Sequence, residues 1–366
     1  MIELVNLTKR YSPAASPAVD RLSLQVGDGE MVVIIGPSGC GKTTTLRMIN
    51  RLIEPTSGRI LIEGNDVTDR RPEELRRSIG YAIQSVGLFP HMTVAGNIAV
   101  VPQLLGWEKG RIDSRVRELL QLIGLKPDTY YAKFPYQLSG GEAQRIGVAR
   151  ALAADPPILL MDEPFGAVDP LTRETLQAQF VEIQRELKKT VILVTHDLDE
   201  AIRLADRIAI MRAGRLVQYD TPETVLRHPA DRFVHDFVGT DRALKRLSRI
   251  NIRPFIHQSS GIDVGASALE AEQACRTCRW IWVTDNGHLI GWLDRTSLAP
   301  GLAPAQVMER VVPDELAVRD SASFREALSR MLAQGIKNLP VIDRDGILLG
   351  EVRMGDIEKA TAEGET

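Results

Sequence analysis

A glycine-rich run near the amino terminus has the composition of a loop that holds the phosphates of a nucleoside triphosphate. It consists of Gly36, Pro37, Ser38, Gly39, Cys40, Gly41, Lys42 and Thr43. The glycines let the backbone curl without Cβ clashes, so that successive N–H groups point at the phosphates. Lys42 would reach the β- and γ-phosphates, and the hydroxyl of Thr43 would bind Mg²⁺. Cys40 occupies a variable position of such loops, where a small space-filling residue suffices.

Two adjacent acids, Asp162 and Glu163, follow an apolar run over 158–161. Such a run is typical of a central parallel strand, and open α/β sheets bind ligands at the carboxyl ends of these strands. Asp162 would hold Mg²⁺ through water, and Glu163 could polarise the water that attacks the γ-phosphate. An acid pair at a strand end can also simply be solvated, but its place after a phosphate loop favours the catalytic interpretation.

Two further polar residues follow predicted strands. His196 comes after the predicted strand 191–195 and could hydrogen-bond the γ-phosphate, or it could be a surface or capping residue. Gln84 comes after the short run 80–83, where its amide could bind the metal or cap a loop. The residues alone leave both alternatives open.

Short buried strands and helices must bring these side chains together. The apolar run 31–35 precedes the phosphate loop, and a helix is expected over 43–53. A strand pair over 207–211 and 215–219 and a capped helix that starts at Thr221 close the pattern. The predicted fold class is α/β.

Seven features in order along residues 1 to 235 resemble the nucleotide-binding subunit of ATP-binding cassette (ABC) transporters. They are an aromatic residue for adenine stacking at Tyr11, the phosphate loop over 36–43, a Q-loop at Gln84, the family motif Leu138-Ser139-Gly140-Gly141-Glu142, Asp162 with Glu163, a D-loop over 166–169, and a switch histidine at His196. The resemblance implies that Tyr11, the phosphate loop, Thr44 and Gln84 bind ATP. It assigns Mg²⁺ to Thr43, Gln84 and Asp162, and catalysis to Glu163 and His196. The implied fold is a P-loop ABC ATPase with a mixed sheet and a helical subdomain over about 86–155.

The family motif implies a dimer. Ser139 has the residue type of a helix N-cap, and a helix is expected from Gly140 to about Ala154, whose bare start can bind an anion. The resemblance implies a head-to-tail homodimer in which each chain completes the ATP site of the other. The partner's ATP would then be contacted by Ser139, Gly140, Gly141, Glu142 and Asp169. Glu142 stands where the family usually has glutamine, which leaves the contact of that side chain open.

The resemblance also implies a membrane permease as a separate chain. The groove beside Phe89, in an apolar loop over 88–94 that precedes an expected helix over 112–123, would receive a coupling helix of the permease, and a solute-binding protein would act only indirectly. Apolar runs here are about five or six residues long, against about 18 to 20 for a spanning helix. Three cysteines, no export signal and a net charge of −3 are typical of a cytosolic protein without a nucleic-acid surface. We therefore expect a peripheral protein on the cytoplasmic face of the inner (plasma) membrane.

An internal repeat lies in the last third of the chain. Residues 283–293 echo residues 341–352, and each copy reads as strand, Asn-Gly or Asp-Gly turn, strand, glycine, strand. The repeat resembles a tandem pair of cystathionine-β-synthase (CBS) motifs of α+β type. A helix over 323–335 is expected before the second copy, with an inward face formed by Phe324, Leu328, Met331 and Leu332.

The predicted domain boundaries follow from these patterns. They are 1–240 for the ATPase, 241–252 for a linker or basic-faced helix, and 253–366 for the tandem CBS domain, with copies over about 253–300 and 305–362.

The second CBS copy departs from the usual nucleotide pattern, in which a Ser or Thr is followed three residues later by an Asp. The acid is present as Asp356, but Arg353 stands at the hydroxyl position. Ordinary ATP or AMP binding is therefore not expected, and Arg353 could instead meet a phosphate. Three roles stay open for this domain: binding a cyclic dinucleotide, sensing ionic strength, or dimerisation alone.

An ABC ATPase followed by tandem CBS motifs resembles the ATPase of the glycine betaine, choline and carnitine uptake systems, which import quaternary amine osmoprotectants. One alternative is an importer ATPase for another solute with a purely structural CBS domain. A second is an ABC protein of DNA repair or translation that drives no transport. Such proteins usually have a coiled-coil insertion or two cassettes in one chain, and this sequence has neither.

Overall fold

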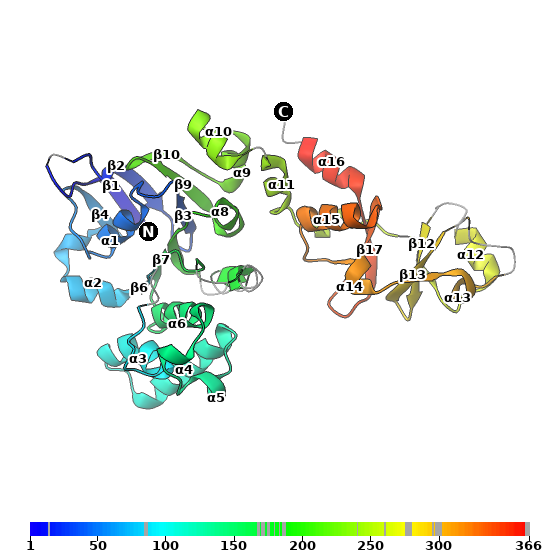
Figure 1. Ribbon diagram of the computed structural model, residues 1–366, viewed down its shortest axis with the longest axis horizontal. Helices are drawn as coiled ribbons and strands as arrows, with labels where there is room; N and C mark the ends of the chain where they lie inside the picture. Colours follow the sequence, from blue (N-terminus) through cyan, green and yellow to red (C-terminus); the bar gives the residue numbers. More distant parts are fainter. Residues whose placement is uncertain are drawn as a thin grey trace. The chain divides into compact units, whose positions relative to one another are not determined.

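The chain divides into two compact units, Met1–Gly239 and Thr240–Thr366. The computed structural model (Figure 1) describes residues 1–13, 15–83, 87–166, 169, 173, 176–178, 180–182, 184, 188–239, 241–259, 261–274, 280–294, 296 and 302–362. No helix within these ranges is long and apolar enough to cross a membrane.

A six-stranded sheet forms the centre of the first unit, in the order β10-β9-β3-β8-β7-β6. The bounds are β3 Met31–Ile35, β6 Ile79–Ala82, β7 Ile158–Asp162, β8 Thr190–Val194, β9 Arg207–Arg212 and β10 Arg215–Asp220. All pairs are parallel except β9 with β10. Strands β3, β7 and β8 are buried along their whole length, as expected of strands covered on both faces. The predicted strands are confirmed, with shifts of one residue at some ends.

A second, antiparallel sheet covers one face of the central sheet, in the order β2-β1-β4-β5. The bounds are β1 Ile2–Lys9, β2 Val19–Val26, β4 Ser57–Ile62 and β5 Asn65–Asp66. Its apolar residues form one core with helix α1 (Lys42–Ile49) and with Val32 and Ile34 of β3. Helix α1 ends earlier than predicted because Asn50 caps it and Arg51 adopts a left-handed conformation with φ 47°.

Helices pack against the opposite face of the central sheet. Met31, Val33 and Ile35 of β3 point into this second core, which includes residues of α3 (Val94–Leu104), α4 (Lys109–Leu122) and α6 (Gly140–Leu152). These helices form a group below the sheets in Figure 1. The helices predicted over 112–123 and from Gly140 are confirmed. Further helical segments of the first unit are η1 Val67–Asp69, α2 Pro72–Ser78, α5 Pro127–Tyr130, η2 Pro135–Gln137, α8 Leu198–Leu204, α9 Pro222–Arg227 and α10 Arg232–Val238.

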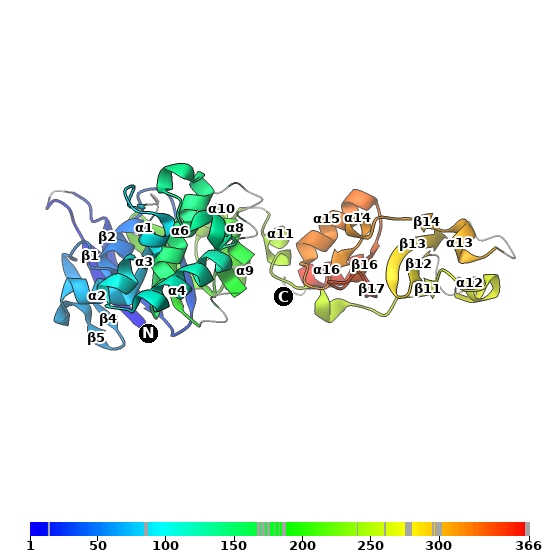
Figure 2. The same cartoon turned by 90° about the horizontal axis from the view of Figure 1, so that it is seen from below.

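The second unit contains the repeat twice, as strand, helix and two strands (Figure 2). The separate strand predicted after the glycine of each copy is wrong, because Gly291 and Gly350 lie within the last strand of their copies. The first copy is β11 Gly261–Asp263, α12 Ala268–Ala274, β12 Trp280–Asp285 and β13 His288–Asp294. The second is β15 Val318–Arg319, α15 Phe324–Gln334, β16 Asn338–Ile342 and β17 Leu348–Arg353, followed by α16 Met354–Ala362. In both copies the first strand is parallel to the second and the second antiparallel to the third. Short elements complete the unit, namely α11 Arg242–Leu247, η3 Arg253–Phe255, α13 Pro304–Val307, β14 Glu309–Arg310 and α14 Pro313–Leu316.

The hairpin turns of the two copies bind each other. The N–H of Leu289 donates to the carbonyl of Gly346 at 3.3 Å, and the N–H of Leu348 donates to the carbonyl of Gly287 at 2.9 Å. An apolar cluster that includes Trp282 of the first copy and Ile342 of the second lies beside these turns. The two copies therefore share backbone hydrogen bonds and a core.

The structure differs from two sequence-based expectations in this unit. Segment 241–252 is not a linker: it contains α11, in agreement with the alternative of a helix, and its Leu247 and Ile252 are buried in the core of the second copy. Leu332, expected to face inward, is 68% exposed, and Ala327 fills the inner face of α15 instead.

Candidate ATP-binding site

Neighbouring parallel strands bring the predicted catalytic residues to one edge of the central sheet. The phosphate loop follows β3, Asp162 ends β7, and His196 lies just beyond β8, the strand between them. The hydroxyl of Thr43 donates to Oδ1 of Asp162 at 3.0 Å. Nδ1 of His196 lies 3.3 Å from Oε2 of Glu163. Gln84 lies outside the described residues.

The phosphate loop has a backbone that only glycine can adopt at two positions. Gly36 has φ 149° and Gly41 has φ 104°, and a Cβ atom there would lie 2.1 Å and 2.3 Å from backbone carbonyl oxygens. Gly39 also has a positive φ, but its Cβ direction is open. At Gly36 and Gly41 a side chain is excluded because another part of the backbone lies where its Cβ atom would be. At Gly39 only the positive φ favours glycine.

Lys42 lies inside this loop, with 7% of the residue exposed. Its Nζ donates to the carbonyls of Gly36 at 2.7 Å and Pro37 at 3.2 Å. These carbonyls hold the ammonium group within the curve of the loop, where a bound phosphate would meet it. Cys40 is buried close by, and burial raises the pKa of its thiol, so Cys40 acts as a neutral space-filling residue.

Thr43 and Asp162 have the chemistry that Mg²⁺ requires. Asp162 is 3% exposed, and burial raises the pKa of its carboxyl group, while the hydrogen bond from Thr43 opposes this rise. A divalent cation would offset the cost of burying the carboxylate, and hydroxyl and carboxylate oxygens are ligands that Mg²⁺ prefers. The residues present therefore fit this ion.

Glu163 is held in an unusual backbone conformation. Its φ of 49° lies in the left-handed region, which costs a non-glycine residue about 1–3 kcal/mol. Its N–H donates to the carbonyl of Val194 at 2.9 Å, and its own carbonyl accepts from Nε2 of Gln144 at 3.0 Å. These bonds fix the backbone of Glu163 on both sides of its Cα, and its carboxylate lies beside His196.

The aromatic residue predicted to stack on adenine lies close to the end of the phosphate loop. Tyr11 is 63% exposed, and its hydroxyl lies 3.5 Å from Oγ1 of Thr44. Nζ of Lys9 lies 5.5 Å from the centre of its ring. An exposed ring at this position offers a flat apolar surface to a base.

The family motif begins helix α6 with a reciprocal cap. The N–H of Glu142 donates to Oγ of Ser139 at 3.3 Å, and the N–H of Ser139 donates to Oε2 of Glu142 at 2.7 Å. The hydroxyl of Tyr130 donates to Oε1 of Glu142 at 2.5 Å, and this bond is the main cause that lowers the pKa of Glu142. Glu142 is thus used by its own helix, where its two carboxylate oxygens accept from the N–H of Ser139 and from the hydroxyl of Tyr130.

The residues predicted to face a partner's ATP are not joined to this chain's phosphate loop. Among the described residues, no hydrogen bond or ion pair links 139–142 with 36–43. Asp169 is exposed, and its carbonyl accepts from the N–H of Arg173 at 2.8 Å.

Two buried polar residues near the site were missed by the sequence analysis. Gln144 of α6 binds the carbonyl of Glu163, and the carboxylate of Glu200 in α8 accepts from the hydroxyl of Thr195, next to His196. Neither residue follows a strand or belongs to the motifs. The only available signal is a polar side chain on the apolar face of a helix.

Two cavities are lined by described residues of the second CBS copy and, in one of them, by His257. One, of about 410 Å³, is lined by His257, Lys337, Asn338, Arg353, Asp356 and Lys359 among others. The predicted pair is found here: Oδ2 of Asp356 accepts from the N–H of Arg353 at 3.0 Å, and both carboxylate oxygens lie 3.0 Å from Nε2 of His257.

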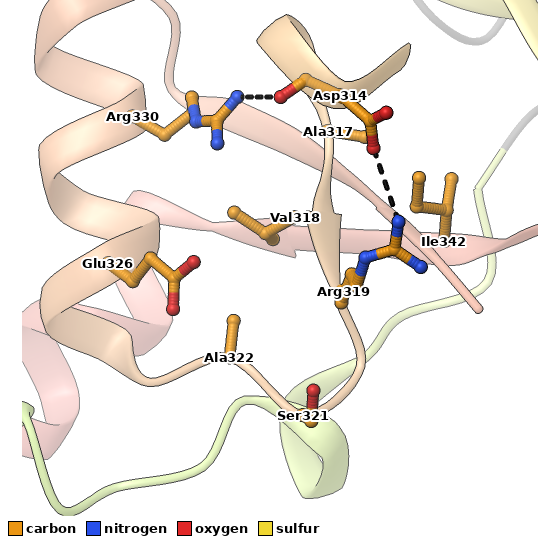
Figure 3. Close-up of a pocket in the computed structure, with 9 residues that line it drawn as sticks. All are labelled: Asp314, Ala317, Val318, Arg319, Ser321, Ala322, Glu326, Arg330 and Ile342. Carbon is orange, nitrogen blue, oxygen red and sulfur yellow. Dashed lines mark hydrogen bonds and ion pairs between the residues drawn. The ribbon is translucent and has the colours of Figure 1, made fainter. Parts of the chain in front are cut away.

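The other cavity, of about 190 Å³, lies between α14 and α15 (Figure 3). Arg330 donates to the carbonyl of Asp314, and Nη2 of Arg319 lies 3.3 Å from its carboxylate. Both arginines are thereby engaged by Asp314. In the first cavity Arg353 is likewise engaged by Glu351, at 3.0 Å, but Lys337 and Lys359 add two further cationic groups to the lining.

Both units of the chain match known protein families. Residues 19–166 match the ABC transporter family, and residues 305–363 match the CBS domain family. The chain is 44% identical to the choline transport ATP-binding protein OpuBA of Bacillus subtilis, over 96% of this chain and 94% of that protein. It is 46% identical to the osmoprotectant import ATP-binding protein OsmV of Salmonella typhimurium, over 100% of this chain and 97% of that protein. Among solved structures, the dimeric bacterial ABC transporter cassette MJ0796 matches with a TM-score of 0.56 and 35% identity, over 61% of this chain and 99% of that one.

The chain therefore belongs to the family of ABC transporter ATP-binding proteins, and it carries a CBS domain. As a member of this family it is an ATP hydrolase coupled to transport. The fold class predicted from the sequence, an ABC ATPase followed by CBS motifs, is confirmed.

Proposed function

We propose that this chain powers the uptake of quaternary amine osmoprotectants such as glycine betaine, choline and carnitine. The observation that carries the proposal is the similarity over nearly the full length, CBS domain included, to proteins named for choline transport and osmoprotectant import. This similarity also disfavours an ABC protein that drives no transport. The solute itself is recognised elsewhere in the transporter, by the permease and an extracytoplasmic binding protein.

The working unit that we propose is a homodimer bound to permease subunits on the cytoplasmic face of the membrane. The dimeric cassette of MJ0796 supports the pairing of two ATPase units. Phe89 supports the docking of a permease segment, because its side chain is 42% exposed while its backbone is fixed. Its N–H donates to Oδ1 of buried Asn97 at 2.7 Å, and its carbonyl accepts from Nδ2 of Asn97 at 3.2 Å.

Hydrolysis in this proposal uses residues from both chains. Lys42, Thr43 and Asp162 bind the phosphates and Mg²⁺ of one ATP, and Ser139, Gly140, Gly141, Glu142 and Asp169 of the partner close over it. Glu163 orients and deprotonates the attacking water, and His196 contacts the γ-phosphate. Bound Mg²⁺ supplies neutralisation of the phosphate charge.

Loss of ATP binding is expected to abolish quaternary amine uptake. Lys42→Ala removes the ammonium group from the phosphate loop, and uptake of radiolabelled glycine betaine, choline or carnitine at high osmolarity should fall about tenfold or more. The matched control is Lys126→Ala, which truncates an exposed lysine of the same unit. If uptake of these amines stays normal while that of another solute is lost, the substrate assignment is wrong, although the ATPase role stands.

We further propose that the cavity of about 410 Å³ binds a cyclic dinucleotide as a regulator. Lys337, Arg353 and Lys359 line it and supply positive charge for phosphates. The same lining contains Glu358, and Nε of Arg353 donates to Oε1 of Glu351 at 3.0 Å, so a phosphate would compete with Glu351 for this arginine. Asp356 is paired with His257, so its carboxylate does not present itself to a ribose as in ordinary nucleotide-binding copies.

Arg353→Ala is expected to weaken binding of cyclic di-AMP or cyclic di-GMP about tenfold or more in calorimetric titrations. The control is Arg344→Ala, which removes an arginine of the same copy outside the cavity lining. Transport measured against salt in a variant without residues 240–366 tests the competing role. If the dinucleotide does not bind but the salt response disappears with the second unit, ionic strength is the signal. If neither response changes, the unit serves only dimerisation or structure.

A further inference from the structure

We infer that Glu200 is a positioning residue that fixes His196 against Glu163 and, together with Arg173 and Gln177, links it to Asp169. The inference rests on the roles proposed above for Glu163, His196 and Asp169. Glu200 lies in the first turn of helix α8, and 6% of the residue is exposed. A buried carboxylate is costly unless its oxygens are hydrogen-bonded, so its partners show what it holds in place.

One oxygen of Glu200 acts on the backbone beside His196 through Thr195. The buried hydroxyl of Thr195 donates to Oε2 of Glu200 and accepts from the N–H of Asp197 at 3.0 Å. In an ordinary capping box, the glutamate of the first turn accepts directly from the N–H of the N-cap residue. Here the N-cap is Asp197, and the threonine hydroxyl is inserted between its N–H and the glutamate. The residues before and after His196 are thereby fixed to the same carboxylate.

The other oxygen of Glu200 contacts a different segment of the chain. Oε1 accepts from Nε2 of Gln177 at 3.2 Å. Oε1 of Gln177 in turn accepts from Nη1 of Arg203 at 3.2 Å. These two bonds fix the orientation of the Gln177 amide, because rotating it would place an NH₂ group against the guanidinium group.

A second contact joins the same two segments. Nη1 of Arg173 lies 3.8 Å from Oδ2 of Asp197, and the N–H of Arg173 donates to the carbonyl of Asp169. The residues that flank His196 are thus held to both Arg173 and Gln177. If a partner chain displaces Asp169, these contacts should therefore change the distance between Nδ1 of His196 and Oε2 of Glu163, which is 3.3 Å here.

Glutamine cannot replace Glu200 in this arrangement. The site presents two donors, the hydroxyl of Thr195 and the amide of Gln177, and the carboxylate has two acceptor oxygens for them. A glutamine has one acceptor oxygen, and its NH₂ group would face a donor. Glu200→Gln keeps the volume of the side chain but should break one of the two links.

The test is a double-mutant cycle in the full-length chain, measured as single-turnover hydrolysis of radiolabelled ATP with protein in excess. Glu200→Gln is expected to lower the hydrolysis rate about tenfold and to leave ATP affinity within about twofold of the wild type. In a His196→Ala background the same substitution should lower the rate by less than about twofold, because the residue that it positions is absent. Asp199→Asn, in the exposed neighbouring residue of α8, is the matched control and should keep the wild-type rate.

The outcomes separate this inference from the proposed function. The positioning role would be overturned if the rate losses of Glu200→Gln and His196→Ala multiply in the double variant. It would also be overturned if Glu200→Gln weakens ATP binding as much as it lowers the hydrolysis rate. Either outcome leaves the proposed contact of His196 with the γ-phosphate unaffected. A wild-type rate in His196→Ala alone would refute both. Should Glu200→Gln fail to fold, Thr195→Val is expected to reproduce the loss of rate, and Thr195→Ser, which keeps the hydroxyl, to stay within about threefold of the wild type. Full activity of Thr195→Val would contradict the inference.

Discussion

Replacing Glu163 by glutamine is expected to lower ATP hydrolysis about a thousandfold while ATP binding is retained. Glutamine has the same size and keeps a hydrogen-bonding group toward His196, which lies 3.3 Å from the carboxylate. The backbone bonds to Val194 and Gln144 do not involve the side chain, so the local fold should persist. The amide cannot accept a proton from water, so the two-chain complex with bound ATP should accumulate.

Phosphate release measures the rate, and light scattering after gel filtration with Mg-ATP measures the dimer. The double variant Glu163→Gln, Lys42→Ala is the control, since a chain that cannot bind ATP should stay monomeric under the same conditions. Sustained hydrolysis in the single variant would remove Glu163 from the role of base.

Two inactive variants are expected to regain activity when they are mixed. Lys42→Ala removes the phosphate contact of a chain's own site, and Ser139→Arg blocks the surface that closes the partner's site. Each variant alone should lose hydrolysis about a hundredfold or more. A mixed dimer carries both defects in one ATP site and leaves the other site intact. With random pairing, half of the dimers are mixed, so about a quarter of the wild-type rate should return if the sites act independently.

The control for this experiment mixes Lys42→Ala with a chain that carries both substitutions, which offers no intact site and should stay inactive. Ser139 also caps α6, and losing an N-cap costs about 1 kcal/mol, so thermal unfolding of each variant must be compared first. Mixed dimers that form but do not hydrolyse ATP would contradict a site shared between two chains.

The central sheet could be predicted because fully buried parallel strands leave continuous apolar runs in the sequence. Strand β3 has the bounds that its run indicates, and the ends of β7 and β8 differ by one residue. Segment 241–252 could not be assigned in the same way. Its charged residues are as numerous as its apolar ones, and the burial of Leu247 and Ile252 depends on α15 and α16, which follow more than 70 residues later.

In the site, too, some residues could be predicted from the sequence and others could not. Lys42, Asp162 and His196 carry their chemistry in short motifs at strand ends, and the parallel order β3-β8-β7 brings them to one edge. Glu200 has no motif, because its role depends on a fold that places Thr195 and Gln177 against it. Residue type and spacing thus identify groups that contact a ligand more readily than groups that hold those contacts in place.

The paired hairpin turns of the second unit decide where this chain can be cut. Ending it between the two CBS copies would leave the N–H of Leu289 without its acceptor and would uncover Trp282, whose Nε1 donates to Glu351 of the other copy at 3.2 Å. Open strand edges and exposed aromatic surface promote aggregation. A chain that keeps only the first CBS copy should therefore aggregate more than a chain that lacks the whole second unit. Variants for crystallisation or transport assays should end at Gly239, and natural shortening of such chains should remove both copies together.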